Sequence, residues 1–232
     1  LVALRRRGFT PSSIRRFCDD IGVSKSNSII PFAKLEEALR LELDEKAVRR
    51  VFIARPVLLN VVNEFTSFKV KAPNHPKLDL GERDFEVSSS MWIDLDDVRL
   101  AGKAEPGFKR VEPGAVFRIM HTGLIYECID VLTNENGEIS NVIARIVTDK
   151  KPKVAIHGLS IDSAISVDIY EPDVIPSDNA NPNDYLIVRK GYCEALALET
   201  EGTFQAVRYG WVVKDINYPG RFILTTSLKN SK

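Results

Sequence analysis

The first fifty residues of the chain have the spacing of amphipathic helices. Thr10 followed by Pro11 is a typical N-cap and first-turn pair, and Gly22 is a typical helix end. Between them, apolar residues recur at helical spacing, at Ile14, Phe17, Cys18 and Ile21. The pattern predicts this helix, a second one over about 32–43 and a third short one near 45–52.

After Pro56 the apolar spacing becomes strand-like, and no further helix is predicted. We expect about ten short strands, at 57–62, 91–95, 116–120, 124–132, 139–147, 154–156, 165–170, 185–188, 204–213 and 222–228. Asn136-Gly137 suits a type I′ turn that joins the two strands around it, and a long polar loop is expected near 171–184. Strands without intervening helices indicate antiparallel barrels or a sandwich, and ten exceed what one small barrel needs.

Composition narrows the class of protein. The chain has 232 residues, enough for one large or two small domains, and no apolar run approaches the roughly 18 residues of a membrane span. Three well-separated cysteines without a CxxC pair fit a reducing cytosol, and the scattered histidines suggest no metal site. The chain starts at Leu1 without an initiator Met, so we expect it to be part of a longer protein.

The net charge of zero hides an uneven distribution. Residues 1–55 contain 12 Lys and Arg against 7 Asp and Glu, whereas residues 162–184 contain six acids and no base. A basic N-terminal part with an acidic region far along the chain could orient an RNA backbone onto one side. The alternative interpretation is that these charges are simply solvated surface.

A set of dispersed motifs resembles the C-terminal, anticodon-binding region of the glutaminyl-tRNA synthetases, nearest to the eukaryotic form. The motifs are Leu4-Arg5-Arg6-Arg7-Gly8-Phe9, Arg15-Arg16-Phe17-Cys18, Pro73-Asn74-His75-Pro76, Trp92-Ile93-Asp94, Glu105-Pro106-Gly107-Phe108-Lys109-Arg110, His121-Thr122-Gly123 and Phe204-Gln205. The resemblance runs from about residue 3 to the end. It implies a mainly β fold with a small N-terminal helical subdomain. Two tandem six-stranded antiparallel barrels would follow, with the chain crossing from one to the other and back.

The resemblance also implies a division of the chain. We expect a helical connector at 1–55 and two barrels in 56–232, one made roughly of 56–110 with 190–232 and the other of 111–189. Neither a His-Ile-Gly-His motif nor a Lys-Met-Ser-Lys-Ser loop is present. The nearest segment, Val23-Ser24-Lys25-Ser26-Asn27, reads as a polar turn in which Ser26 or Ser28 could cap a helix. Catalytic residues are therefore expected upstream, in the domain that uses ATP with magnesium to join glutamine to its tRNA.

In the resembled family, two of the matched positions read the central anticodon base and a third lies near the loop. Arg49 and Gln205 match residues that read the central uridine, and Arg208 matches an arginine near the loop. An amide presents a donor and an acceptor together, which suits the edge of uracil. The alternative interpretations are an arginine favoured by a helix C-terminus and an ordinary exposed glutamine.

Three more positions match residues near the other anticodon bases. Arg110 matches an arginine that reads the third base, a guanine, and an arginine fork on guanine provides about 1–3 kcal/mol of discrimination. Lys109 is expected to contact phosphate or loop. Arg118 matches an arginine for phosphate or the first base, but Met120 replaces a further arginine of the family, which weakens the expectation for first-base reading.

The cluster Arg5, Arg6 and Arg7 is expected to contact the tRNA backbone, with a solvated terminus as the alternative. Two further segments depart from the family, because Ile156-His157-Gly158 lacks an aromatic residue and Phe222-Ile223-Leu224-Thr225-Thr226 lacks an amide and a cation. We expect His157 to be structural.

The resemblance implies a cytoplasmic, monomeric ligase with glutamine tRNA as partner and no membrane association, and it allows membership of a multi-synthetase complex. Two rival functions stay open. An archaeal or eukaryotic type of glutamyl-tRNA synthetase shares this architecture, and its anticodon has cytosine at the third position. A free-standing RNA-binding barrel protein is the rival from another class, although the segment from Arg5 to Phe17 resembles a synthetase connector.

Overall fold

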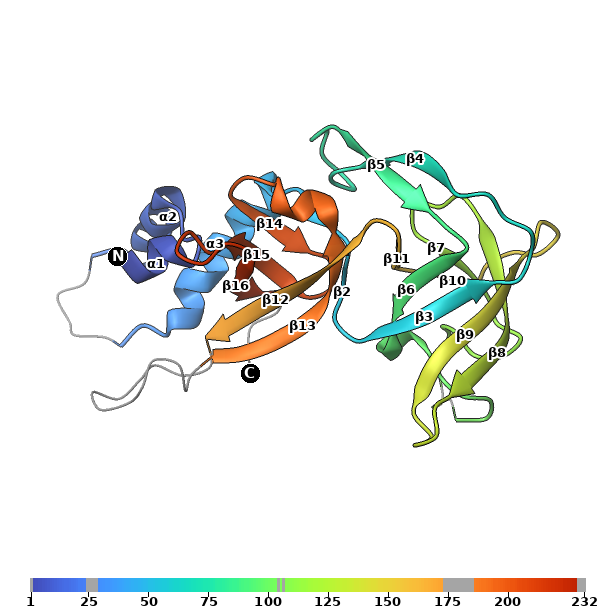
Figure 1. Ribbon diagram of the computed structural model, residues 1–232. Coiled ribbons are helices and arrows are strands. Elements are labelled where there is room, and N and C mark those ends of the chain that lie inside the picture. Colours follow the sequence, from blue (N-terminus) through green and yellow to red (C-terminus); the bar gives the residue numbers. More distant parts are fainter. Residues whose placement is uncertain (1, 24–28, 104, 106, 173–185, 229–232) are drawn as a thin grey trace.

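Three helices precede two barrels in the computed structural model, which describes residues 2–23, 29–103, 105, 107–172 and 186–228 (Figure 1). The helices are α1 (Val2–Arg6), α2 (Pro11–Ile21) and α3 (Phe32–Lys46). The backbone amide of Ser13 donates to Thr10 Oγ1 at 3.0 Å, which confirms the predicted cap of α2, and Gly22 ends that helix as expected. None of the described helices is long and apolar enough to cross a membrane.

The short helix predicted near 45–52 is wrong, because this segment forms two short strands. It contributes β1 (Arg49–Arg50) and β2 (Phe52–Ile53), which join a sheet made otherwise of strands from the second half of the chain. Local spacing had suggested a helix, whereas pairing with distant strands decides the outcome. Polar residues 24–28, expected to form a turn with a serine cap, and most of the expected loop at 171–184 lie outside the described residues.

The first barrel is a sheet in the order β1-β14-β15-β16-β12-β13-β2. Its other strands are β12 (Ala164–Pro172), β13 (Leu186–Glu194), β14 (Thr203–Ala206), β15 (Gly210–Lys214) and β16 (Arg221–Ser227). The two strands at the ends of this order, β1 and β2, are consecutive in the chain and separated only by Val51. One interrupted strand thus closes the sheet into a six-stranded barrel.

The second barrel closes in the same way, in the order β10-β7-β8-β9-β3-β6-β11. Its strands are β3 (Pro56–Val61), β6 (Ser90–Asp94), β7 (Val116–Ile119), β8 (Ile125–Thr133), β9 (Ile139–Ile146), β10 (Val154–Ile156) and β11 (Gly158–Ser160). The terminal strands β10 and β11 are separated by His157 alone. The predicted pair of six-stranded barrels is therefore confirmed.

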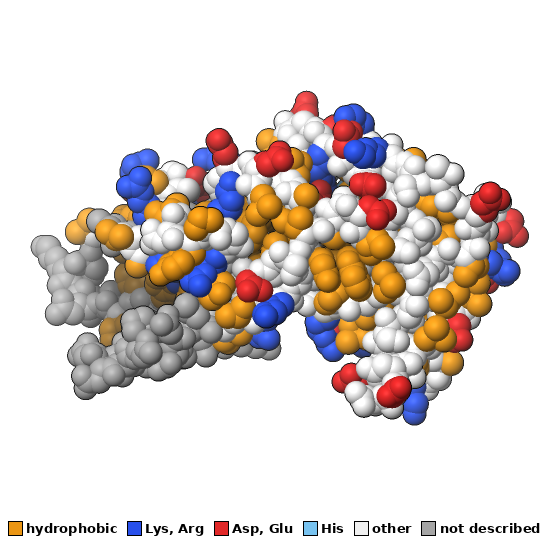
Figure 2. All heavy atoms as spheres, viewed as in Figure 1, with side chains coloured by type: hydrophobic (Ala, Val, Ile, Leu, Met, Phe, Trp, Pro, Cys, Tyr) orange, Lys and Arg blue, Asp and Glu red, His pale blue; other side chains and the backbone are white. Residues whose placement is uncertain are grey.

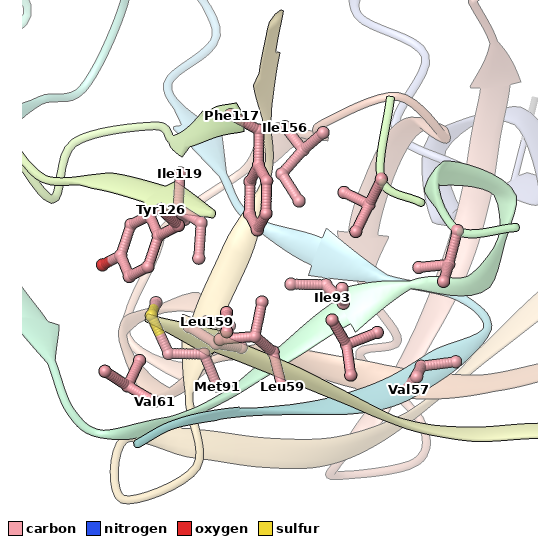
Figure 3. Close-up of a cluster of buried hydrophobic side chains, with 14 of the residues drawn as sticks. Val57, Leu59, Val61, Met91, Ile93, Phe117, Ile119, Tyr126, Ile156 and Leu159 are labelled. Atoms are coloured by element: carbon pink, nitrogen blue, oxygen red, sulfur yellow. The ribbon is translucent and has the colours of Figure 1, made fainter. Parts of the chain in front are cut away.

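The barrel interiors are filled by alternate apolar residues of the strands. Figure 3 shows inward side chains of the second barrel lying against one another, among them Leu59, Met91, Ile93, Phe117 and Tyr126. Each of these five is at most 1% exposed. The first barrel has its own smaller cluster, and a third cluster joins α3 to Trp211 of β15.

The division of strands between the barrels corrects the expected one. Residues 56–61 and 90–94 pair within the same sheet as residues 116–160, whereas residues 164–172 belong to the other sheet. The chain makes one strand of the first barrel, builds the whole second barrel and then returns. Because of these long connections four of the strand pairs are parallel, so the barrels are mixed rather than purely antiparallel.

A two-stranded hairpin of β4 (Phe68–Pro73) and β5 (Glu82–Val87), which strand reasoning missed, spans the junction (Figure 1). Arg83 of the hairpin donates from Nε and Nη2 to Glu194 of the first barrel, at 2.5 and 2.8 Å. The backbone amide of Val51 also donates to Glu194 Oε1, at 2.6 Å. This buried ion pair thus links the hairpin to β13 of the first barrel. The same carboxylate also holds Val51, the residue at which that barrel closes.

The predicted hairpin between β8 and β9 is confirmed, but its turn is not type I′. That turn requires two consecutive residues with positive φ, and here Gly137 has a φ of 78° while Asn136 does not have one. The side chain of Asn134 accepts from the backbone amides of Asn136 and Glu138, both at 3.0 Å. A longer turn capped by Asn134, with glycine at its left-handed position, therefore makes the connection.

Candidate nucleic-acid interface

Two of the predicted uridine-reading residues lie side by side where the first barrel closes. Arg49 of β1 and Gln205 of β14 are register partners on parallel strands, and the backbone amide of Gln205 donates to Val48 O at 2.9 Å. Gln205, the single glutamine of the chain, is only 7% exposed, and its side chain makes no hydrogen bond with the described residues. A largely buried amide with unused donors and acceptors is suited to pairing with a base edge that reaches it.

The side chain of Arg49 is held from the other side by an acid, and a histidine ring lies beside it. Its Nη2 lies 3.2 Å from Asp44 Oδ1 and 3.3 Å from His75 Nε2. The ring of His75 is itself fixed, because its Nδ1 accepts from the backbone amides of Lys77 and Leu78. Burial and the neighbouring charge of Arg49 lower the pKa of His75, which keeps the ring neutral beside the guanidinium.

Arg208 occupies a tight turn between β14 and β15. Its φ is 68°, a left-handed value that is uncommon outside glycine, and the amide of Tyr209 closes the turn on Ala206 O at 3.0 Å. The hydroxyl of Tyr209 donates to Glu171 of β12, and its ring packs edge-on against Phe52 with centroids 4.9 Å apart. These contacts fix the turn, and with it the direction of the Arg208 side chain.

Arg110 and Arg208, which come from different barrels, meet on one carboxylate. Asp97, the last residue of the 3₁₀ helix η1 (Leu95–Asp97), accepts from Arg110 Nη1 on Oδ1 and from Arg208 Nη1 on Oδ2. The side chain of Asp97 is 0% exposed, whereas those of Arg110 and Arg208 are 41% and 35% exposed. The two guanidinium groups therefore reach solvent from a shared buried anchor.

A small cavity of about 130 Å³ opens beside Arg208 at the junction. Its walls include the aromatic rings of Phe52 and Tyr209, the carboxylate of Asp94 and the imidazole of His157. Burial, with the charges of Arg208 and Arg110, lowers the pKa of His157 to about 4, so this ring is neutral near pH 7. The cavity thus combines aromatic walls with donors and acceptors, the combination that unstacked bases require.

Lys109 and Arg118 are exposed cations of the second barrel. Lys109 directly precedes Arg110, and Arg118 lies on β7 opposite Ala155 of β10. Among the described residues neither side chain has an ion-pair partner, so both charges are available to a phosphate. Met120 follows at the end of β7, where its backbone amide donates to Ile156 O at 2.9 Å.

The three N-terminal arginines do not form a common cationic surface. Arg6 makes a bidentate ion pair with Asp215, at 3.0 and 2.7 Å, and Arg7 donates to Thr225 O at 3.1 Å. Burial lowers the pKa of Arg7, which also lies over the ring of Phe9. Arg5 is exposed on α1 and has no ion-pair partner among the described residues, so it is the member of this cluster whose charge is both unpaired and open to solvent.

Sequence reasoning did not identify the residues that hold these arginines. Asp97 lies in an ordinary acidic run, Asp94-Leu95-Asp96-Asp97, and its burial between two arginines has no local signal. Asn74, in contrast, belongs to a motif singled out in the sequence, and its Oδ1 accepts from Arg50 Nη1 at 2.8 Å. The motif residues thus partly mark the scaffold around the site rather than the site itself.

The surface around this junction carries both signs of charge. On the face shown in Figure 2, the outline is indented between the two barrels, and Lys and Arg side chains lie on both sides of the indentation. Acidic side chains are spread over the rest of this face, in keeping with a net charge of zero. Positive charge is therefore confined to parts of the surface, which suits a protein that contacts an RNA backbone on one side only.

Residues 47–147 match the family described as "tRNA synthetases class I (E and Q), anti-codon binding domain". This match begins just before β1 and contains the strands of the second barrel from β3 to β9, but not β10 and β11. It contains Arg49, Lys109, Arg110 and Arg118, whereas Gln205 and Arg208 lie beyond it.

The whole chain is similar to bacterial proteins named glutamine–tRNA ligase. It is 35% identical to that of Nitrosomonas europaea, and 33% identical to those of Polynucleobacter asymbioticus and Ralstonia pickettii, with 100% of the chain aligned in each case. The chain spans 46%, 45% and 45% of the lengths of these relatives, which is less than half. These three relatives are bacterial, so the expected closeness to the eukaryotic form stays a prediction.

Proposed function

We propose that this chain, whose residues 47–147 match the anticodon-binding domain of the class I tRNA synthetases for glutamate and glutamine, reads the anticodon of a glutamine tRNA. The central uridine would meet Arg49 and Gln205, with Arg208 beside them, and the third-position guanine would meet Arg110. Lys109 and Arg118 would contact the phosphates around the loop, as Arg5 would along the tRNA backbone.

The observation that supports this proposal best is the convergence at the barrel junction. Arg49 and Gln205 are register partners, Arg208 follows three residues later in a fixed turn, and Arg110 shares an acid with Arg208. Four residues chosen from sequence motifs, up to 159 positions apart, thus surround one junction with a cavity beside them. Guanidinium forks and an amide on a rigid scaffold are what reading of splayed bases needs.

For the whole protein we propose the activity that its relatives' names carry, ligation of glutamine to its tRNA. The part of the relatives that the chain does not span would then bind ATP with magnesium and glutamine. The chain itself would select the tRNA by its anticodon. We also propose a cytoplasmic, monomeric enzyme, with a multi-synthetase complex as a further partner to test.

The proposal is tested by measuring the affinity of the chain for anticodon stem-loops of glutamine tRNA at one fixed, moderate salt concentration. Changing the central uridine or the third-position guanine should each weaken binding about tenfold, equivalent to about 1.4 kcal/mol. Arg110→Ala should abolish discrimination at the third base only, and Gln205→Ala at the central base only. The control is Arg145→Ala, which removes an exposed barrel arginine paired with Glu127 at 2.9 Å. This variant should discriminate at the central base and at the third base as the unmodified chain does.

The stem-loop series also separates the rival functions. A preference for cytosine at the third position would assign the chain to a glutamyl-tRNA synthetase, which the matched family includes. Binding that ignores every change of the loop sequence would instead indicate a barrel that binds only the RNA backbone. Either result would overturn the proposed reading of a glutamine anticodon.

A further inference from the structure

Asp97 is held in place by backbone pairing with the segment that carries Arg110. The amide of Val111 donates to Asp97 O, and the amide of Arg99 donates to Val111 O, both at 2.9 Å. At the other end of η1, the side chain of Asp94 caps the helix by accepting from the amide of Asp96 at 3.0 Å. The position of the Asp97 carboxylate is thus set by the second barrel, independently of Arg208.

The two arginines on Asp97 use only part of their hydrogen-bonding capacity. Each donates to Asp97 through Nη1, and neither makes another side-chain hydrogen bond with the described residues. A guanidinium has five N–H donors in a planar fork, so most donors of Arg110 and Arg208 face the partly exposed side.

We propose that Asp97 is a positioning residue that aims Arg110 and Arg208 together, so that one buried carboxylate of the second barrel couples base reading at two anticodon positions. This inference rests on the proposed function and goes beyond it, because Asp97 itself would touch no base. Arg110 belongs to the second barrel and Arg208 to the first, so their shared anchor also links the two halves of the reading surface.

Two physical effects make such an anchor useful. Arginine loses side-chain freedom when it binds a base, and a side chain already held by Asp97 loses less on binding. Two guanidinium groups that converge on one site also repel each other, and a carboxylate between them removes that repulsion. Loss of the carboxylate would therefore both loosen the two forks and push them apart.

The test compares Asp97→Asn with Asp215→Asn in the stem-loop assay of the whole chain. Both substitutions neutralise a carboxylate whose side chain is 0% exposed and bound by arginine, but Asp215 pairs with Arg6. For Asp97→Asn, we expect discrimination to fall at least fivefold at the third base and at least threefold at the central base. For Asp215→Asn, discrimination at each of the two bases should stay within twofold of the unmodified chain, although the protein will be less stable.

A double variant distinguishes positioning from a purely structural role. If Asp97 acts on the central base through Arg208, adding Asp97→Asn to Arg208→Gly should cause no further loss of the central-base discrimination that Arg49 and Gln205 still provide, and glycine accepts the left-handed φ of 68° at this turn. Asp97→Glu, which restores the charge, should recover part of the lost discrimination. A folded Asp97→Asn variant that discriminates like the unmodified chain would overturn the inference, while the proposed function would stand.

If Asp97→Asn does not fold, Asp97→Glu decides instead. Glutamate keeps the negative charge between the two arginines but carries its carboxylate on a side chain one methylene longer, so the anchor moves while the ion pairs remain. The inference expects discrimination at the third base and at the central base each to fall at least twofold relative to the unmodified chain. Unchanged discrimination at both bases would overturn the inference. An unmodified chain that discriminates no base at all would instead refute the proposed function.

Discussion

At the scale of single residues, the neighbours of each arginine decide its role. Arg50 is buried and donates to Thr200, whereas Arg6, Arg110 and Arg208 each bind a buried acid and still reach solvent. An arginine bound to a buried acid stabilises the fold, because leaving such an acid unpaired is costly. The same residue type thus serves as internal support in one place and, under the proposed function, as an RNA contact in another.

Arg5 and Arg6 provide a direct comparison of these two roles. Arg6→Ala leaves the buried carboxylate of Asp215 without its ion-pair partner and should lower the free energy of unfolding by about 1–3 kcal/mol. Arg5→Ala removes an exposed charge, so it should change stability by less than about 0.5 kcal/mol and weaken RNA binding modestly at low salt. Urea denaturation and stem-loop binding measure the two effects, and equal stability losses would contradict this assignment.

At the scale of elements, short-range signals predict some features well. The cap at Thr10 and the end at Gly22 bound α2 as expected, because the groups that satisfy a helix end come from neighbouring residues. The segment 45–52 behaves differently, since β1 and β2 form only by pairing with β14 and β13. For the turn at Asn136-Gly137, the sequence predicted the location correctly, but the predicted turn type was wrong.

Gly137 offers a test of the observed turn. A Cβ at this position would meet nothing within 4 Å, so the cost of Gly137→Ala should come only from the left-handed φ of 78°. We expect the free energy of unfolding to fall by about 1–2 kcal/mol. Gly137→Asn should cost less, because asparagine tolerates this conformation, and thermal or urea denaturation would show the order. Equal losses for both variants would contradict the conformational explanation.

At the scale of the whole molecule, the two barrels are joined by more than the chain. The buried pair of Arg83 and Glu194 spans the junction, and the ring of Trp92 in the second barrel stacks on Tyr192 of the first with centroids 4.7 Å apart. Asp97 and its two arginines form a third connection. These contacts should make the barrels unfold as one cooperative unit.

The two tryptophans of the chain report this cooperativity, because Trp92 lies in the second barrel and Trp211 in the first. In urea, fluorescence of Trp92→Phe and Trp211→Phe variants should give the midpoint that circular dichroism gives for the same variant. Adding Arg83→Ala leaves Glu194 buried without its ion-pair partner, so the two midpoints should separate, with a loss of about 3–5 kcal/mol in total. Coincident midpoints after that change would show that other contacts couple the barrels.

The sequence by itself determined the class of fold and the identity of most candidate contact residues. Strand spacing after Pro56 predicted a β fold with more strands than one small barrel needs, because alternation of apolar residues is a local property of a strand with one buried face. The family resemblance supplied the pair of barrels. Motifs at Arg49, Arg110 and Gln205 identified residues whose chemistry suits RNA. None of these inferences required knowledge of distant contacts.

Only the tertiary structure decided how these parts are assembled. Each barrel closes through a strand interrupted at one residue, Val51 or His157, and this closure depends on pairing between segments far apart in the chain. The convergence of Arg110 and Arg208 on Asp97 depends on the same long-range pairing. Burial of a carboxylate likewise depends on what packs over it, and an acidic run does not reveal which of its members is covered. Long-range pairing and burial therefore determine which charges remain available for RNA.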